Sequence, residues 1–522
     1  MAAWADNTSE TESLRRILWV DDEIEFLRAH IMFLEDQGWV VDKATNGHDA
    51  LGLVRTTEYD VVLLDEQMAG LDGLTTLQKL KAEHPRLFVV MVTKSEEERL
   101  MEEAIGRNID GYVTKPVNPG QIVTLCRSLF NVRSLRSNHL TSRYVRQYAE
   151  NKARMLGQVA PADWERIHAR LCGWDLDLAA AGQEGLFQTH KGQRDETEAA
   201  FLGYLENNRY PWMGRDRFKP NFVWDFLPKR VAPLLKDGKN LAVIILSGLR
   251  TDQWLAMQGL LEGLFEPKLE HHWSLLPGVP ETARMSLLGA TTPRQLGSEN
   301  AAWAWPERAN LSDPEFVRAV LQRGAKASAI AQEFDLRLVR TAHEGKQLAA
   351  RAGGLGSPAW IQVEFQGILQ EMVDASRGED PVAMPIERFR EHARKFLATA
   401  GFYSLLRKLA QEGRTVLVAS DFGTTLVTDA VEVFCTEQGP TDFRIQFGAG
   451  ISCDERHAFF VEHPPAAGLD GSRGAMVLAR GAHYFTQPNK FQYYGTRHLG
   501  RLVSGGLTMH EMLVPVCQLS PA

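Results

Sequence analysis

The sequence predicts a multidomain α/β protein, and three observations lead to this prediction. Short runs of Val, Ile and Leu alternate with amphipathic stretches near the N-terminus and again in the second half of the chain. This alternation is typical of sheets that are covered by helices on both faces. The length of 522 residues exceeds what one hydrophobic core usually supports. Between the two α/β regions, a stretch rich in Arg, Ala and Leu has no strand-like run, which predicts helices.

These changes of pattern divide the chain into four segments. Residues 1–14 are polar and acidic and lack the apolar core of a signal peptide, so we expect a disordered tail. Residues 15–131 form the first α/β domain, residues 132–200 a helical connector, and residues 201–522 a second α/β domain. Two or three hydrophobic cores are therefore expected.

The composition disfavours several classes of protein. A net charge of -8 argues against a dedicated nucleic-acid binder, because contacts with phosphates need a basic surface. The five cysteines are scattered and form no Cys-x-x-Cys pair, which argues against a disulfide framework or a cysteine zinc site. No stretch approaches the roughly 18 apolar residues of a membrane span. We expect a cytoplasmic protein without membrane insertion and without a nucleic-acid partner.

The first α/β domain contains five strand candidates, which are short, apolar and bounded by turn residues: Ile17–Val20, Val40–Ala44, Val61–Leu64, Leu87–Val92 and Gly111–Val113. Amphipathic stretches between them, such as Glu23–Gln37 and Leu74–His84, predict helices. The second α/β domain has further strand candidates: Leu241–Leu246, Trp360–Val363, Thr415–Ala419 and Met476–Leu478.

Polar residues follow four of the five strands predicted in the first domain. Asp21 and Asp22 follow the first strand, and Asp65 follows the third. Thr93 follows the fourth strand, and Lys115 comes shortly after the fifth. Because the carboxyl ends of parallel strands meet at one edge of a sheet, these residues are expected to converge. Five such residues in this order predict a functional site rather than a set of solvated loops.

The converging residues are suited to the transfer of a phosphoryl group to a carboxylate. Asp21, Asp22 and Asp65 offer the oxygen ligands that Mg²⁺ prefers, and the carboxylate of Asp65 can attack phosphorus. The Lys115 ammonium group and Mg²⁺ would neutralise charge on the transferred oxygens. Thr93 offers a hydroxyl group that can bind the phosphoryl group once it has arrived.

This order and spacing resemble the receiver domains of two-component response regulators over residues 15–130. The resemblance implies a flavodoxin-like fold, phosphorylation of Asp65 by a histidine kinase, and homodimerisation upon phosphorylation. The face involved would be formed by the fourth helix, the fifth strand and the fifth helix, at about Glu96–Phe130. Tyr112 lies in this region and could repack when Thr93 moves.

Several motif segments of the second α/β domain occur in a recognisable order: Leu246–Trp254, Leu276–Arg284, Ser420–Thr424, Ser504–Gly506 and Glu511–Pro515. They resemble the PglZ domain, a branch of the alkaline phosphatase superfamily, and imply an alkaline-phosphatase-like α/β fold. Together with the receiver, the chain is similar to the PorX-type response regulators. In the PglZ family, two zinc ions and a threonine nucleophile hydrolyse phosphate esters.

Seven positions correspond to the metal ligands and the nucleophile of that family: Ser247, Pro280, Gly367, Glu371, Asp421, Phe422 and Ser504. Among these, only Asp421 keeps the type of a metal ligand. Pro280 stands in the place of the nucleophilic Thr and has no hydroxyl group, while Phe422 stands in the place of a His. The resemblance therefore predicts a degenerate site without zinc, and a pseudophosphatase that binds a protein or a ligand when the receiver is phosphorylated.

An alternative is a receiver-regulated, metal-dependent phosphodiesterase or phosphatase with a rearranged site. Residues that could supply ligands are His271, His272 and His510, with Asp252 and Glu281 as surface acids. Adjacent histidines on a strand point to opposite faces and rarely chelate one ion together, so we expect satisfied core or surface residues. No helix-turn-helix is visible, which disfavours a transcriptional regulator. The PorX-type resemblance implies a sensor kinase and a secretion or gliding apparatus or a sigma factor as partners.

Overall fold

The computed structural model describes the backbone of most of the chain, over these residues: 15–94, 109–212, 219–300, 310–376, 385–436, 443–461, 475–486 and 498–522. The side chains of residues 131–138 and 209–212 are not described. The chain divides into two compact units, Met1–Val145 and Arg146–Ala522. The boundary between them falls within helix α5 (Pro119–Met155).

The first unit has a parallel five-stranded sheet in the order β2-β1-β3-β4-β5. Its strands are β1 (Arg16–Val20), β2 (Val40–Ala44), β3 (Val61–Asp65), β4 (Phe88–Thr93) and β5 (Gly111–Thr114). Its helices are η1 (Ile24–Leu27), α1 (Arg28–Glu35), α2 (Gly47–Thr56), α3 (Gly73–Glu83) and α5. The five predicted strands are confirmed within a residue at each end. The predicted fourth helix lies outside the described residues.

Alternate residues along each central strand of this sheet point to opposite faces, and both faces are buried. On one face, Trp19 and Leu63 pack against apolar residues of α1 and α5 such as Leu34 and Ile122. On the other face, their neighbours in sequence pack against residues of α2 and α3. This two-sided burial explains why the strands are almost uninterrupted apolar runs, and it leaves polar residues for the strand ends.

The second unit begins with helices that the sequence predicts as a connector. Helix α6 (Pro161–Ala181) starts at Pro161, whose missing N–H is not needed at a helix N-terminus. Gly182, with φ 64°, ends α6 in the left-handed region that favours glycine. Helix α7 (Glu184–Trp212) then runs past residue 200, where the sequence places the end of the connector. Within the described residues, no helix is both long and apolar enough to span a bilayer.

The main sheet of the second unit has six strands in the order β7-β18-β10-β6-β9-β8. The strands are β6 (Leu241–Leu246), β7 (Phe265–Trp273), β8 (Asp335–Val339), β9 (Ala359–Val363), β10 (Thr415–Ala419) and β18 (Leu513–Pro521). β10, β6, β9 and β8 are parallel, whereas β18 and β7 are antiparallel to their neighbours. The polar ends of the parallel strands therefore share one edge of the sheet.

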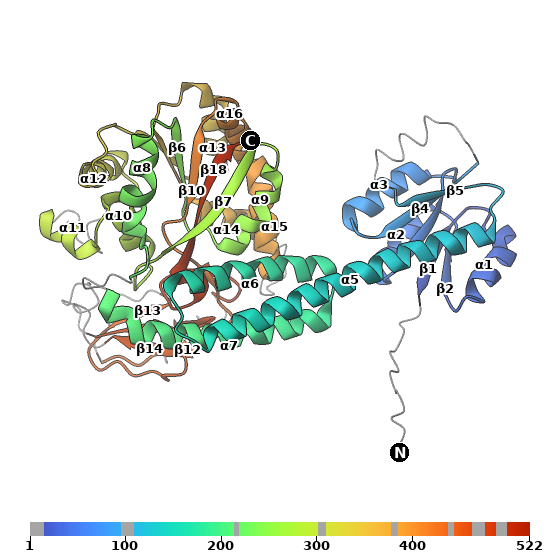
Figure 1. Cartoon of the computed structure of the whole chain (residues 1–522), viewed down its shortest axis with the longest axis horizontal. Helices are drawn as coiled ribbons and strands as arrows, with labels where there is room; N and C mark the ends of the chain where they lie inside the picture. Colours follow the sequence, from blue (N-terminus) through green and yellow to red (C-terminus); the bar gives the residue numbers. More distant parts are fainter. Residues whose placement is uncertain are drawn as a thin grey trace, which may run out of the picture. The chain divides into compact units, whose positions relative to one another are not determined.

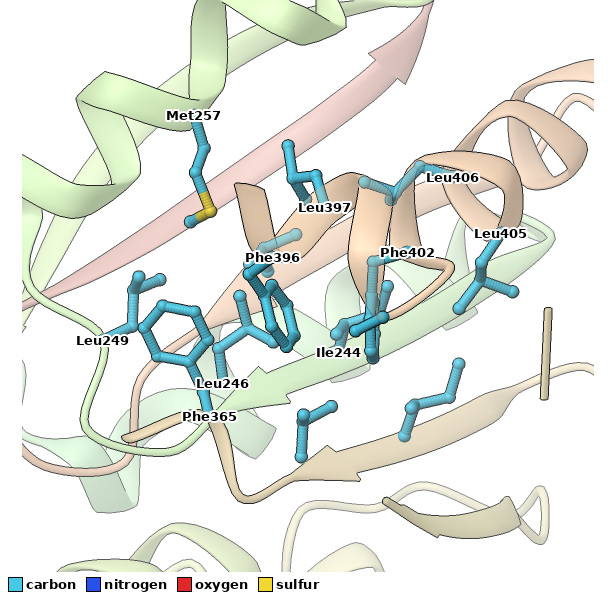
Figure 2. Packing of buried hydrophobic residues seen from close by; sticks show 14 of the residues in the cluster. Ile244, Leu246, Leu249, Met257, Phe365, Phe396, Leu397, Phe402, Leu405 and Leu406 are labelled. Atoms are coloured by element: carbon cyan, nitrogen blue, oxygen red, sulfur yellow. The ribbon is translucent and has the colours of Figure 1, made fainter. Parts of the chain in front are cut away.

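Both faces of this sheet are covered by helices, as in the first unit (Figure 1). The longer covering helices are α9 (Thr251–Gln258), α10 (Pro280–Gly289), α12 (Pro314–Ala327), α13 (Ala342–Ala350), α14 (Phe365–Ala375), α15 (Ile386–Thr399) and α16 (Phe402–Gln411). Figure 2 shows the core on the face of α9, α14, α15 and α16, where Phe396 lies among Ile244, Leu246 and Phe402. Helices α10 and α12 pack on the opposite face.

Shorter helical segments connect these elements: η2 (Val223–Asp225), η3 (Leu227–Val231), α8 (Ala232–Lys236), η4 (Gly259–Leu261), α11 (Pro293–Glu299), η6 (Ala352–Gly354) and α18 (Met509–Met512). The described residues after β10 also form three small sheets. Two of them pair two short strands each: β11 (Thr425–Leu426) with β17 (Leu502–Val503), and β12 (Asp429–Glu432) with β16 (His483–Thr486). The third has three strands in the order β13 (Ile445–Gly448), β15 (Ala475–Ala479) and β14 (Ala458–Val461).

The connector helices share a hydrophobic core with the rest of the second unit. Trp164 of α6 and Phe201 of α7 pack in one cluster with Trp273 of β7 and with apolar residues of β13, β14 and β15. The indole of Trp273 also donates a hydrogen bond of 2.9 Å to Glu165. The connector is thus an integral part of the second unit rather than a flexible tether.

We expect a fragment of residues 146–522 to fold without the first unit, because its cores are complete. A shorter fragment of residues 219–522 should aggregate or unfold at lower denaturant concentration, since removing α6 and α7 exposes Trp273 and the β13-β15-β14 sheet. Urea unfolding followed by circular dichroism checks both fragments. Equal stability of the two fragments would contradict a shared core.

Candidate functional site

The polar ends of the receiver-like sheet converge as the sequence predicts. One carboxylate oxygen from each of Asp21, Asp22 and Asp65 lies within 4.8 Å of the others. The Lys115 ammonium group is 2.9 Å from Asp21 and 3.0 Å from Asp65. Asp21 and Asp65 are buried, whereas Asp22 is exposed. We call Asp21, Asp22, Asp65 and Lys115 the acceptor cluster.

A close backbone approach fixes the loop after Asp65. A Cβ atom on Gly73, the first residue of α3, would lie 2.3 Å from the carbonyl oxygen of Asp65 and 2.7 Å from the Cα of Glu66. Only glycine fits there, so the start of α3 packs against the end of β3. A pocket beside Asp22 is lined by Glu66, Gln67 and further residues of this loop. The acceptor cluster is therefore open to a reactant on this side.

Burial and ion pairing with Lys115 shift the pKa of Asp65 in opposite directions. Burial, followed by the nearby charges of Asp21 and Asp22, raises the pKa of Asp65, although Lys115 opposes this shift. Burial lowers the pKa of Lys115, but its hydrogen bonds with Asp21 and Asp65 outweigh burial, so this pKa is raised overall. Lys115 thus stays charged and partly compensates carboxylates that repel one another.

Glu66 is a residue of this site that the sequence reasoning missed. The hydroxyl group of Thr93 donates a short hydrogen bond to the Glu66 carboxylate, and Thr93 is buried. Glu66 directly follows Asp65 in the sequence, and this position could have identified Glu66 as part of the site. Tyr112 of β5 has 47% of its surface exposed, so its ring is free to change position.

At the equivalent edge of the second sheet, a buried arginine joins residues from four elements. Arg284 of α10 donates hydrogen bonds to Asp421 after β10 (2.8 Å), Ser247 after β6 (2.9 Å) and Glu364 after β9 (2.6 and 3.1 Å). Ser247 donates to Asp421 at 3.0 Å and accepts from Gln362 at 2.7 Å. We call Ser247, Arg284, Gln362, Glu364 and Asp421 the Arg284 cluster.

The structure brings together some, but not all, of the positions that the sequence compares with the PglZ site. Phe422 packs beside Gly248, next to Ser247, and Pro280 is the first residue of α10. The turn containing Ser504 approaches the start of α10, since a Cβ on Gly505 would lie 3.4 Å from Val279.

Gly367 and Glu371 do not join the Arg284 cluster. Both are exposed residues of α14, one and two turns beyond the end of β9. The acid that contacts Arg284 is Glu364, directly after β9. Glu364 is thus a residue of this cluster that the sequence reasoning did not single out.

A second buried network, which the sequence reasoning missed, connects the connector helices to the main sheet. Asp252 binds Arg250 at 2.9 Å and Arg390 at 2.9 Å. Arg390 reaches Asp175 of α6 at 3.0 Å, and Asp175 also binds Arg194 of α7. We call these five residues the Asp252 network. Asp252 is fully buried and ion-paired, so it is a satisfied core residue, one of the two expected alternatives, and not a surface acid.

Three residues next to this network could in principle hold a metal ion, namely His168, Cys172 and His510. Their surroundings oppose a cation. Arg250 and Arg194 lie 3.1 and 3.3 Å from Nε2 of His510, and burial raises the pKa of the Cys172 thiol to about 12. Two guanidinium groups beside the His510 imidazole repel a cation, so this group is better explained as packing around the Asp252 network.

His271 and His272 are both buried and point to different faces of β7, as expected. His271 contacts Thr251 at 3.1 Å, whereas His272 packs against Phe226. Burial lowers the pKa of His271 to about 4 and that of His272 to about 3. Both are neutral core residues, which confirms their interpretation.

Family models match three consecutive parts of the chain. The response regulator receiver domain matches residues 17–127, and the PorX response regulator linker domain matches residues 134–213. The BREX system PglZ alkaline phosphatase-like domain matches residues 226–519, more than half of the chain. The chain belongs to the PglZ family. Its receiver, linker and PglZ domains have the order of a PorX-type response regulator.

Curated relatives resemble the receiver of this PglZ-family protein. The transcriptional regulatory protein ResD of Bacillus subtilis is 32% identical over 124 residues, 24% of this chain and 50% of ResD. The transcriptional regulatory protein SrrA of Staphylococcus aureus is 33% identical over 113 residues, 22% of this chain and 46% of SrrA. The chain thus spans about half the length of the curated relatives it matches.

Solved receiver domains are also similar to this part of the chain. The Francisella response regulator 1452 receiver domain is 25% identical, with a TM-score of 0.22, and the match covers 22% of this chain and 97% of that chain. The NtrX receiver domain of Brucella abortus is 28% identical, with a TM-score of 0.21, and the match covers 22% and 98%.

Replacing Asp65 by Asn should stabilise the first unit near pH 7 in the absence of Mg²⁺. The raised pKa means that folding disfavours the ionised Asp65, so its favourable contribution is complete below about pH 4 and is lost as the pH rises through its folded-state pKa. We expect the variant to unfold at a higher urea concentration than the wild type at pH 7, and we expect this difference to disappear in acid.

Urea unfolding at several pH values in the presence of a chelator measures this difference. Asp22→Asn is a matched control at an exposed position and should change stability less. An Asp65→Asn variant that is no more stable than the wild type at pH 7 would show that Lys115 fully compensates the buried charge.

Proposed function

We propose that the protein is a two-component response regulator that a histidine kinase phosphorylates on Asp65, and that its PglZ domain binds a protein or ligand without hydrolysing phosphate esters. The observation that supports the first part is the acceptor cluster, in which a buried aspartate lies between a lysine and two further carboxylates. The receiver family supports the kinase as the phosphate source. The cytoplasmic location remains a prediction.

Phosphorylation would proceed by attack of an Asp65 oxygen on phosphorus, while the bond between phosphorus and the kinase histidine breaks. The Lys115 ammonium group lies 3.0 Å from the attacking carboxylate, so it can stabilise the negative charge on the transferred oxygens. Asp21, Asp22 and Asp65 have the all-oxygen donor set that fits Mg²⁺, which would supply further positive charge there.

The Thr93–Glu66 hydrogen bond suggests how the receiver would respond. In the unphosphorylated state, Glu66 holds the Thr93 hydroxyl group. A phosphoryl group on Asp65 is a stronger acceptor, and it repels the neighbouring Glu66 carboxylate. Thr93 would exchange partners and vacate space that the exposed ring of Tyr112 can fill. This repacking would change the face that includes β5 and α5, on which we propose that homodimers form.

The residues at the PglZ site support a role in binding rather than in hydrolysis. Pro280 has no hydroxyl group for attack, and Phe422 offers no ligand atom. Ser247 is engaged by Asp421, Gln362 and Arg284. The PglZ fold is retained although these groups are replaced. This combination favours a domain that is kept because its surface or cleft binds a partner. A secretion-system component or a sigma factor would be the partner class that PorX-type regulators suggest.

Beryllofluoride, which mimics a phosphoryl group on aspartate, should increase the mass of the protein in solution if phosphorylation drives dimerisation. Light scattering with and without the mimic measures this change. Asp65→Ala should abolish it and should also abolish labelling by small phosphodonors. Label that persists in the variant would identify another acceptor, and an unchanged wild-type mass would place the switch within one chain.

Purified protein should not hydrolyse a generic phosphodiester, whether or not Zn²⁺, Mn²⁺ or Mg²⁺ is added. The physical reason is the loss of the nucleophile at Pro280 together with most ligand atoms. Turnover with each metal, with and without beryllofluoride, tests this expectation. Metal-dependent turnover would establish the alternative of a phosphodiesterase with a rearranged site.

A further inference from the structure

The Arg284 guanidinium group occupies the meeting point of the strand ends in the PglZ domain. Arg284, Ser247 and Asp421 are all buried, at 5%, 1% and 0% exposure. One oxygen of Asp421 accepts from Arg284 and Ser247, and the other accepts from the backbone N–H of Phe422 at 3.1 Å. Both oxygens of the one retained ligand-type residue are therefore already engaged by donors within the protein.

From this geometry we infer that Arg284 is an internal replacement for the metal ions of the PglZ site. The inference rests on the proposed function and adds a specific residue to it. The residues present do not fit zinc, because the space between Ser247, Glu364 and Asp421 is filled by a cation from the chain itself. The positive charge that the buried carboxylate needs is supplied permanently, without an open coordination position for water or a phosphate ester.

Charge and shape explain why an arginine suits this position. Burial lowers the pKa of Arg284, but the charges of Asp421 and Glu364 outweigh burial and raise it, so the guanidinium group remains charged. Its planar group carries five N–H donors, which reach three acceptor residues at once. A lysine ammonium group lacks this breadth, and a zinc ion would require several carboxylate or imidazole ligands where this chain has Ser247 and Phe422.

The backbone positions the guanidinium group firmly. Helix α10 begins at Pro280, which places Arg284 one turn into the helix and above the strand ends. A Cβ on Gly324 of α12 would lie 2.0 Å from the carbonyl oxygen of Leu288, so the two helices are in close backbone contact. This contact holds α10 against α12 and fixes the direction from which Arg284 enters the cluster.

The test restores a metal site by removing the internal cation. In the full chain, Arg284→Ala combined with Ser247→Asp presents three carboxylates around the vacated space. We expect this double variant to retain about one zinc ion per chain after incubation with Zn²⁺ and gel filtration, and to unfold at a higher temperature when Zn²⁺ is present. The wild type and the single Ser247→Asp variant should retain no zinc, because Arg284 remains in place.

Arg390→Ala is the matched control, since it removes another buried arginine that bridges two carboxylates. Asp252 and Asp175 keep Arg250 and Arg194 as partners in this variant, so it should not gain zinc. Elemental analysis, with circular dichroism to confirm folding, gives the readout for all variants.

The outcomes separate this inference from the proposed function. A folded double variant without zinc would show that Arg284 is only an ion-pair partner, while the non-hydrolytic role would stand. Zinc bound to the Ser247→Asp variant would also overturn the inference, and this variant is informative even if Arg284→Ala does not fold. Stoichiometric zinc in the wild type would overturn both the inference and the proposed non-hydrolytic role.

Discussion

The need to pair buried carboxylates with positive charge determines both strand-end sites of this protein. A carboxylate that loses water without gaining a cation or several hydrogen bonds would destabilise the fold by several kcal/mol. Asp65 is paired with Lys115, Asp421 with Arg284, and Asp252 with Arg250 and Arg390. Asp65 and Asp421 lie at or just after a strand end, whereas Asp252 lies in the first turn of α9. The chemistry available at each site depends on which positively charged group is paired with the acid.

The receiver sheet and the PglZ sheet pair the buried carboxylates at their edges in different ways. In the receiver, one lysine faces three carboxylates, so negative charge remains in excess and Asp22 stays exposed to solvent. Such an edge can take up a divalent cation and a phosphoryl group. In the PglZ domain, one guanidinium group contacts Asp421, Glu364 and Ser247 at once. These contacts pair the buried charges at this edge and hold the strand ends together.

The fold could be predicted from sequence wherever local pattern decides it. The receiver strands β1, β3 and β4 and the two central strands at Leu241 and Thr415 are nearly continuous apolar runs, and their ends were found because buried parallel strands allow few polar residues. Strand β7 was missed because its first half contains the exposed polar run Glu-Pro-Lys at residues 266–268. The acceptor residues were identifiable because each follows its strand directly.

Ion pairs between distant parts of the chain could not be predicted in this way. Arg284 and Asp421 are separated by 137 positions, and Arg390 and Asp175 by 215. Nothing near Arg284 in sequence distinguishes a metal-replacing arginine from one at the surface of a helix. The residue types at the compared positions could be read from the sequence, but the ion pair between Arg284 and Asp421 could be found only from the fold.

The Asp252 network links the connector helices α6 and α7 to the loops at the strand ends of the PglZ sheet. Arg250 follows Ser247 by three positions in the same loop, and its guanidinium group also binds the carbonyl oxygen of Thr424, three residues after Asp421. The partners of this network in α6 and α7 are Asp175 and Arg194. A displacement of either helix would leave buried charges unpaired unless the loops after β6 and β10 moved with it. The cost of unpaired charge thus couples the connector to the surface that the PglZ domain presents.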